Sequence, residues 1–114
     1  MKRKADRRVY QLQAEICKVL ANPIRLEILN LIGDREVAYG ELLSRLGISK
    51  TNLSQHLALL RQSGVLVDRR EGVHSYYRLT FPEIEEACRA VQNIFAKRLR
   101  ETGRQAKMLL RQVG

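Results

Sequence analysis

Residues 47–62 read GISKTNLSQHLALLRQ, a pattern that predicts a turn followed by a helix with two very different faces. Gly47 suits the tight turn that leaves a preceding helix, and Ser49 is a good N-cap for the following one. Apolar residues then recur at i, i+4 and i+7, which places them on one stripe of the helix. The stripe consists of Leu53, Leu57 and Leu60.

The opposite face of this helix carries small and amide side chains and no acid. A solvated surface helix would normally mix Glu with Lys at positions one turn apart. Short donors and acceptors in the first turns suit a recognition helix, which contacts base edges and phosphates of DNA. The alternative is an ordinary amphipathic helix. The candidate DNA-binding residues here are Ser49, Lys50, Thr51, Asn52, Ser54 and Gln55.

The composition of this 114-residue chain predicts one small basic domain. Lys and Arg number 21 against 12 Asp and Glu, which gives a formal charge of +9. This excess indicates a polyanionic partner, with a membrane surface as the competing one. No run approaches the roughly 18 apolar residues of a membrane span, and no signal-peptide core follows the basic start. We therefore expect a cytoplasmic protein that does not enter a membrane.

Caps, breakers and periodicity predict the order of elements along a single domain, residues 1–114. We expect a basic tail (1–6), a helix (7–20), a helix (24–32), a helix-turn-helix (39–62), a hairpin (65–79), a last helix (82–102) and a C-terminal extension (103–114). Both terminal helices carry more apolar surface than one small domain covers, so we expect a dimer through them. The predicted fold class is mainly α with a small β-hairpin, a winged helix-turn-helix with about five helices.

The predicted hairpin carries basic side chains beside its expected turn at Glu71-Gly72. Basic residues next to an exposed β-turn suit contacts with phosphates or with the minor groove of DNA. The alternative is a hairpin tip that is merely solvated. The candidate contact residues of this wing are Arg69, Arg70, His74 and Arg78.

Three segments in this order resemble the ArsR/SmtB family of winged-helix repressors. They are LANPIRLEIL at 20–29, ISKTNLSQHL at 48–57, and the wing residues REG at 70–72 with YYRL at 76–79. The resemblance implies a homodimer joined through its first and last helices. It also implies binding to an inverted-repeat operator in double-stranded DNA and release by a small inducer.

The sensing residues of that family do not carry over to this chain. Residues 36–41 hold no cysteine where the family has its thiolate motif, and no histidine follows His74. Asn30 and Ala96 stand where the thiol-sensing relatives place their two cysteines. We therefore expect no metal site and no cofactor, and the identity of the inducer stays open.

Cys17 and Cys88 are the two cysteines of the chain, too few for a disulfide framework or a four-thiolate zinc site. Each lies on the apolar stripe of a terminal helix, and in the family those helices pack together. A disulfide, a persulfide bridge or a soft-metal clip between them would act as a thiol switch. The alternative is that both cysteines only fill space. His56, on the leucine face of its helix, is expected to be a core or interhelical histidine.

The leading hypothesis is a dimeric, sequence-specific repressor without catalytic residues. One alternative is a repressor that senses thiol chemistry or soft metals through Cys17 and Cys88. Another is a non-sensing winged-helix module for DNA or protein contacts. A small enzyme is disfavoured because the sequence has no nucleophile elbow, metal-ligand cluster or phosphate loop.

Overall fold

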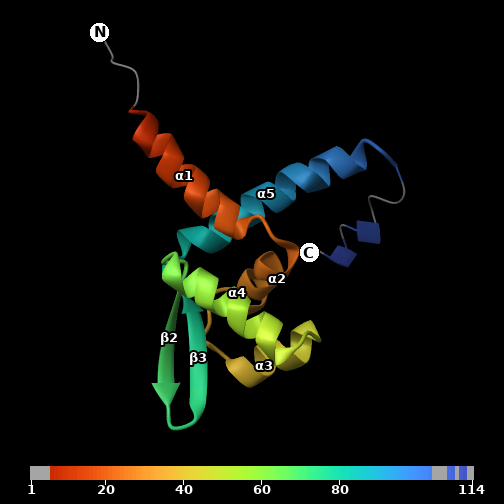
Figure 1. The fold of residues 1–114 in the computed structure, drawn as a ribbon. Coiled ribbons are helices and arrows are strands. Elements are labelled where there is room, and N and C mark those ends of the chain that lie inside the picture. The colour runs from red at the N-terminus through yellow and green to blue at the C-terminus, as the bar shows by residue number, and fades with distance from the viewer. Residues whose placement is uncertain (1–5, 104–107, 110, 113–114) are drawn as a thin grey trace.

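The computed structural model describes residues 6–103, 108, 109, 111 and 112. In this part of the chain the elements are α1 (Arg7–Leu20), α2 (Pro23–Ile32), β1 (Val37–Ala38), α3 (Tyr39–Leu46), α4 (Lys50–Gln62), β2 (Leu66–Glu71), β3 (His74–Leu79) and α5 (Glu83–Arg100) (Figure 1). The prediction of a mainly α winged helix-turn-helix is confirmed. Most of the predicted basic tail and most of the C-terminal extension lie outside the described residues.

The core lies between α2, α3, α4 and the sheet. Its buried residues are Ile28, Leu29, Ile32, Val37, Leu42, Leu53, Leu57, Leu60, Val65, Leu66 and Leu79. The whole predicted leucine stripe of α4 is among them, so the polar face of that helix points outward. Full burial of one such side chain contributes about 1.5–3 kcal/mol. The apolar residues of the predicted helix 24–32 indicate that Leu26 is buried with Ile28, Leu29 and Ile32, but Leu26 is 43% exposed.

Local caps fix where α2, α3 and α4 begin and end. The Asn22 side chain accepts hydrogen bonds from the backbone N–H groups of Ile24 and Arg25 at 2.9 and 3.1 Å. Gly47 ends α3 with φ of 65°, a left-handed conformation that glycine adopts without strain. Ser49 then caps α4 by accepting from the Asn52 N–H at 3.1 Å. These caps set the turn of the helix-turn-helix.

The wing is the β2–β3 hairpin of a three-stranded antiparallel sheet in the order β1-β3-β2. Leu66 pairs with Leu79 at its base, and Glu71 pairs with His74 at its tip. The turn is therefore Gly72-Val73, one residue later than the Glu71-Gly72 turn that we predicted. The reason is that Glu71 still belongs to the strand ladder, while Gly72 supplies the positive φ of 63° that the tight turn requires.

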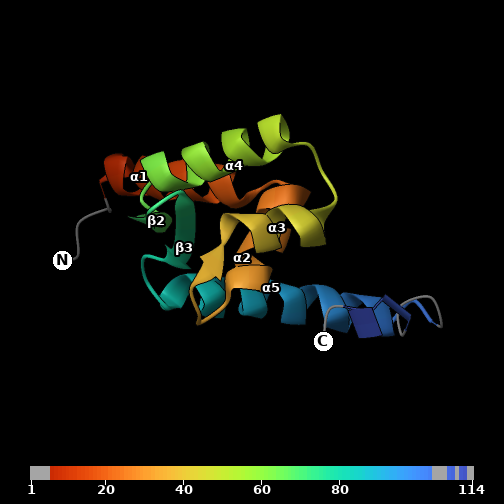
Figure 2. The same cartoon turned by 90° about the horizontal axis from the view of Figure 1, so that it is seen from below.

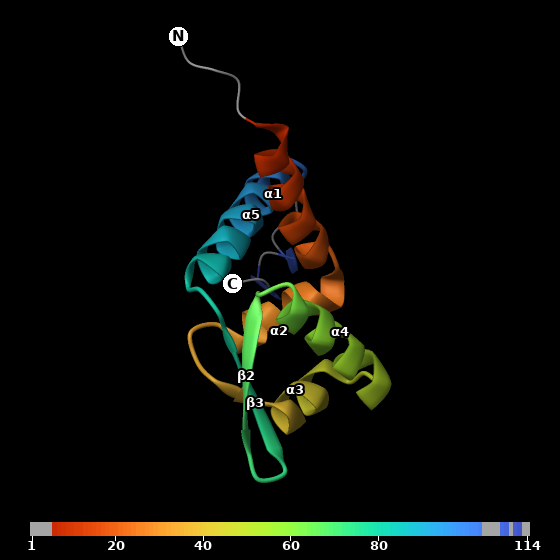
Figure 3. The same cartoon turned by 60° about the vertical axis from the view of Figure 1, so that its left-hand side comes forward.

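α1 and α5 project from the side of the molecule opposite the tip of the wing (Figures 1 and 3). α1 contains no buried residue and rests on α2 at its C-terminal end. The large apolar side chains left exposed on these two helices are Val9, Tyr10, Leu12, Ile16, Val91, Ile94 and Phe95. Within the described residues, this apolar face is left uncovered. None of the helices in the described residues is long and apolar enough to cross a membrane.

Gly33, which ends α2, provides a test of the packing between α2 and α5. Its φ is +56°, and a Cβ atom added there would lie 3.1 Å from Oε2 of Glu85 in α5. We expect Gly33→Ala to lower the free energy of unfolding by about 1–3 kcal/mol, because the backbone is strained for alanine. Denaturant unfolding followed by circular dichroism measures this change.

Gly40→Ala is the matched control, because Gly40 lies within α3 and a Cβ there would meet no atom within 4 Å. Alanine at this helical position should raise the free energy of unfolding by about 0.5–1 kcal/mol. Equal stabilisation by both substitutions would show that the Gly33 conformation and its contact with α5 are not as described.

Candidate nucleic-acid interface

The polar face of α4 is fully accessible. Burial of the leucine stripe turns it outward, and α5 lies on the other side of α2 (Figure 2). All six residues that we predicted on this helix and its cap are exposed, namely Ser49, Lys50, Thr51, Asn52, Ser54 and Gln55. Several of them, with Ala58, line a shallow hollow along the helix. The structure therefore brings the predicted contact residues of α4 onto one open surface.

The N-terminal end of α4 has the electrostatic character of an anion-binding site. Lys50 is the first helical residue, and the first turn contains no acid. The helix dipole adds partial positive charge at the same end, where backbone N–H groups favour an anion such as phosphate. Both the side chain and the backbone here would attract a nucleic-acid backbone.

Tyr39, the first residue of α3, joins this surface although the sequence analysis did not select it. Its hydroxyl lies 3.2 Å from the Ser54 hydroxyl and donates a hydrogen bond to the Lys50 carbonyl at 3.4 Å. The half-buried ring packs against the core. Tyr39 thus ties the start of α3 to the polar face of α4. The signal was missed because 15 residues separate Tyr39 from Ser54.

Arg69 in β2 is held in place by its neighbours within the wing. Its Nη2 and Nε lie 2.7 and 3.0 Å from the two carboxylate oxygens of Glu36, and its Nη1 lies 3.1 Å from Glu71. The guanidinium also stacks over the Tyr76 ring, 4.5 Å from its centroid. Hydrogen bonding to Arg69 lowers the pKa of Glu36, and the same bond raises the pKa of Arg69. Arg69 therefore connects the wing to the segment before β1.

Arg70 points to the other face of the hairpin. Arg69 pairs with Tyr76 and Arg70 with Ser75, and successive side chains of a strand alternate between its faces. His74 and Arg78 lie on the Arg69 face. Arg70, His74 and Arg78 are exposed, and none of them makes an ion pair with another described residue. The wing thus offers cations on both of its faces.

His56 lies between helices, as the sequence analysis expected. It is half-buried, and its Nδ1 lies 3.4 Å from Nη1 of Arg25 in α2. Burial lowers the pKa of His56, and the charge of Arg25 lowers it further. The imidazole therefore stays neutral near pH 7 and serves as a contact between α4 and α2.

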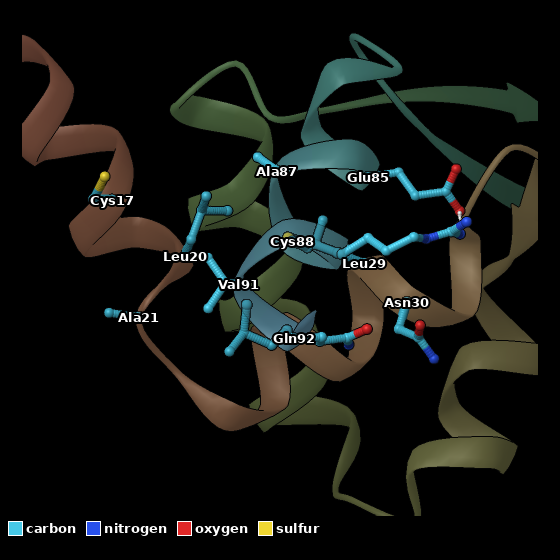
Figure 4. A pocket seen from close by; sticks show the side chains of 12 residues that line it. Cys17, Leu20, Ala21, Leu29, Asn30, Glu85, Ala87, Cys88, Val91 and Gln92 are labelled. Atoms are coloured by element: carbon cyan, nitrogen blue, oxygen red, sulfur yellow. Dashed lines mark ion pairs between the residues drawn. The ribbon is translucent and has the colours of Figure 1, made fainter. Parts of the chain in front are cut away.

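Cys17 and Cys88 line one apolar cavity of about 350 Å³ between α1, α2 and α5, together with Leu29, Asn30 and Gln92 (Figure 4). Both are free thiols; Cys17 is exposed and Cys88 is half-buried. Burial raises the pKa of Cys88, which disfavours the reactive thiolate. In the described residues no three His, Cys, Asp or Glu side chains are placed to hold a metal ion.

Comparison with known proteins extends this picture. The family model described as a helix-turn-helix domain matches residues 20–69. The HTH-type transcriptional regulator Rv0081 of Mycobacterium tuberculosis is 40% identical over 90 residues, which cover 78% of this chain and 79% of the relative. The crystal structure of Rv0081 matches with a TM-score of 0.75 at 39% identity, over 82% of this chain and 95% of that chain.

Two further relatives carry more specific descriptions. The arsenical resistance operon repressor of Escherichia coli is 39% identical over 72 residues, 62% of each chain. A homodimeric winged helix-turn-helix DNA-binding domain from Mycobacterium bovis, described as a possible ArsR-family regulator, matches with a TM-score of 0.69 at 31% identity. That match covers 82% of this chain and 89% of that chain.

An exposed, acid-free helix after a tight turn, with a basic hairpin beside it, defines a winged helix-turn-helix transcriptional regulator. Within that class the chain belongs to the ArsR family, as its identity with these regulators over most of its length shows. The resemblance seen in the sequence is confirmed.

The burial of Cys88 gives a test of the thiol-switch hypothesis. We expect Cys88 to react with iodoacetamide at least about tenfold more slowly in the folded protein than in the urea-unfolded chain, because the buried thiol resists ionisation. Mass spectrometry of quenched time points, with the Cys88→Ser variant reporting on Cys17 alone, measures both rates. Equal rates for Cys88 in the two states would instead favour a reactive, switch-like thiol.

Proposed function

We propose that this chain is a homodimeric, non-enzymatic repressor that binds an inverted-repeat operator in double-stranded DNA. The observation that carries the proposal is the open polar face of α4, which has no acid and lies directly over the buried leucine stripe. Such a helix enters the major groove with its N-terminal turns against the bases. The name of the Escherichia coli relative supports the repressor role.

The contact residues divide into base readers and phosphate binders. Thr51, Ser54 and Gln55 have short or amide side chains suited to base edges, and glutamine can pair with adenine through two hydrogen bonds. The proposed phosphate contacts are Ser49, Lys50, Asn52, Arg70, His74 and Arg78. Arg69 contributes mainly by holding the wing to Glu36.

A second copy of the chain is the proposed cover for the apolar faces of α1 and α5. Leu12 and Val91 are 63% and 64% exposed, so among the described residues neither helix finds enough apolar surface to cover it. A two-fold dimer places two recognition helices about 34–36 Å apart, which matches successive major grooves. The homodimeric Mycobacterium bovis domain supports this arrangement.

The proposal includes release of the operator by a small inducer whose chemistry stays open. Sensing through Cys17 and Cys88 is the weaker alternative, because burial keeps Cys88 protonated. A winged-helix module that senses nothing would bind its operator without release. We propose the cytoplasm as the place where this regulator meets its operator.

Selection of bound fragments from random duplex DNA tests the function. We expect an inverted repeat whose halves lie about one helical turn apart, bound at least about 10³-fold more tightly than random duplex. Gln55→Ala should then cost about 1–3 kcal/mol on this operator and relax the preference at one base position, because it removes a base-reading amide. Binding titrations on operators varied base by base measure both effects.

Gln62→Ala is the matched control, since Gln62 is an exposed glutamine of the same helix, two turns further from its N-terminus. Its affinity and base preference should stay near those of the parent. The proposal that α4 reads bases in the major groove would be contradicted if the selection enriched no sequence. It would also be contradicted if Gln55→Ala changed neither affinity nor base preference on the enriched sequence.

The two neighbouring arginines of the wing should behave differently on DNA. Arg70→Ala should weaken binding to operator and random duplex alike and reduce the salt slope by about one, because it removes a phosphate contact. Arg69→Ala should leave the salt slope nearly unchanged, since its guanidinium is engaged by Glu36 and Glu71. Affinities measured across a series of salt concentrations give both slopes.

Glu36→Gln serves as the control for Arg69, because it removes the carboxylate partner of that arginine and leaves the guanidinium in place. A smaller salt slope for Arg69→Ala than for Arg70→Ala would contradict the proposal that Arg70 contacts phosphate while Arg69 holds the wing. It would mean that Arg69 leaves its carboxylates to bind phosphate.

A further inference from the structure

Arg25, in the first turn of α2, contacts both the helix before it and the recognition helix. Its Nε donates a hydrogen bond to the backbone carbonyl of Val19 in the last turn of α1. Its Nη1 lies 3.4 Å from Nδ1 of His56, near the middle of α4. The Asn22 cap fixes the backbone of Arg25 by accepting its N–H at 3.1 Å. One guanidinium thus spans from α1 to α4.

The contact with Val19 links Arg25 to the direction of α1. The last carbonyls of a helix have no partner within the helix, and Arg25 satisfies one of them. α1 has no buried residue and leaves its apolar face open, so within a dimer its direction depends on the second copy. Any change in the angle between α1 and α2 moves the Val19 carbonyl. It therefore shifts the Arg25 guanidinium that is hydrogen-bonded to this carbonyl.

The contact with His56 links Arg25 to the DNA-reading face. His56 follows Gln55 directly and lies between the buried leucines of α4. The position of its imidazole therefore changes when that helix rotates about its axis. A neutral imidazole accepts the Arg25 N–H at Nδ1 and keeps its own proton on Nε2. A protonated imidazole has no acceptor left and carries a positive charge beside the guanidinium.

We propose that Arg25 is a positioning residue that couples the dimerisation helix α1 to the recognition helix α4, and that this coupling holds only while His56 is neutral. The proposal rests on the proposed function, because it names the regulation of the same DNA-binding surface. It makes operator binding sensitive to acid through one interhelical contact.

The surroundings of His56 set the direction of the pH effect. Burial lowers its pKa from the ordinary value of 6.5, and the Arg25 charge lowers it further. Arg25 of α2 is the charged group that acts on His56. The strand β2 also packs on α4, and its Asp68 pairs with Arg61 of that helix at 3.5 Å. The contact is therefore intact at pH 7.5. The unfolded chain binds this proton from about pH 6.5 downward, so the folded protein begins to lose stability there. The contact itself is lost only when His56 of the folded protein becomes protonated, at a lower pH.

A nuclear magnetic resonance titration tests the coupling without DNA. In the parent protein, protonation of His56 should shift the backbone amide resonances of residues 19–21 along with the imidazole signals. In Arg25→Gln those amide shifts should vanish and His56 should titrate at a higher pH, because the repelling charge is gone. Amides at the end of α1 that ignore the His56 titration in the parent protein would overturn the proposal, whether or not the variant folds.

Operator binding tests the functional consequence in a His74→Gln background. The chain has two histidines in total, so this background leaves His56 as its single imidazole. Affinity for the selected operator should fall at least about fivefold between pH 7.5 and a pH below the His56 midpoint that the titration gives, which is less than the full loss of one hydrogen bond to a charged group. His56→Gln in this background should show a flat profile.

At pH 7.5 Arg25→Gln should weaken operator binding about tenfold. Arg25→Lys keeps the positive charge but lacks the planar guanidinium that donates to two partners, so it should recover part of that loss. Arg89→Gln, which removes an exposed charge on α5 paired with Glu85, is the matched control and should bind like the parent. Independent, multiplicative effects of Arg25→Gln and His56→Gln would overturn the coupling. Failure to select any operator would refute the proposed function. The nuclear magnetic resonance titration would still show whether Arg25 couples His56 to the end of α1.

Discussion

Burial of Leu53, Leu57 and Leu60 is the constraint on which the rest of this structure depends. These side chains repeat with the period of a helix, so removing them from water fixes the rotation of α4 about its axis. A rotation by one residue, about 100°, would carry Ser54 and Arg61, or Asn52 and His56, into the core without partners and would cost about 1–3 kcal/mol or more. The pattern that stabilises the fold therefore also presents Thr51 and Gln55 to the outside.

In the wing the direction of each side chain is also fixed by the periodicity of the backbone, here the two-residue period of a β-strand. Arg69 and Arg70 are adjacent and chemically identical, yet strand alternation sends them to opposite faces of the hairpin. Arg69 meets Glu36, Glu71 and the Tyr76 ring. Each exposed ion pair contributes little to the free energy of unfolding. The main effect of these contacts of Arg69 is to fix the direction of the wing. Arg70 keeps its charge available to a partner.

The elements and the reading face could be predicted from the sequence because their causes are local. The Asn22-Pro23 break, Gly47, the Ser49 cap and the leucine period each act within a few residues. The turn of the wing was placed one residue early, since only the strand register shows that Glu71 pairs with His74. Leu26 was placed wrongly because it faces the cavity beside α1 and α5 and not the core.

The interactions that local patterns could not predict are those that join distant parts of the chain. Arg69 and Glu36 are 33 residues apart, Arg25 and His56 are 31 apart, and Tyr39 and Ser54 are 15 apart. Each depends on how whole helices and strands pack, which leaves no periodic trace in the sequence. Arginine, histidine and tyrosine at these positions read equally well as solvated residues, so their roles required the structure.

The arrangement of the helices also limits how this protein can be regulated. The apolar face that a second copy would cover lies on α1 and α5, whereas the reading face of α4 lies across α2 from α5. A signal received at α5 therefore has to pass through or around α2 before it reaches DNA. The buried residues of α2 are leucine and isoleucine, and a closely packed core of this kind resists deformation. Polar contacts at its edge can exchange partners without opening that core, and the first turn of α2, where Arg25 meets both α1 and α4, is such an edge.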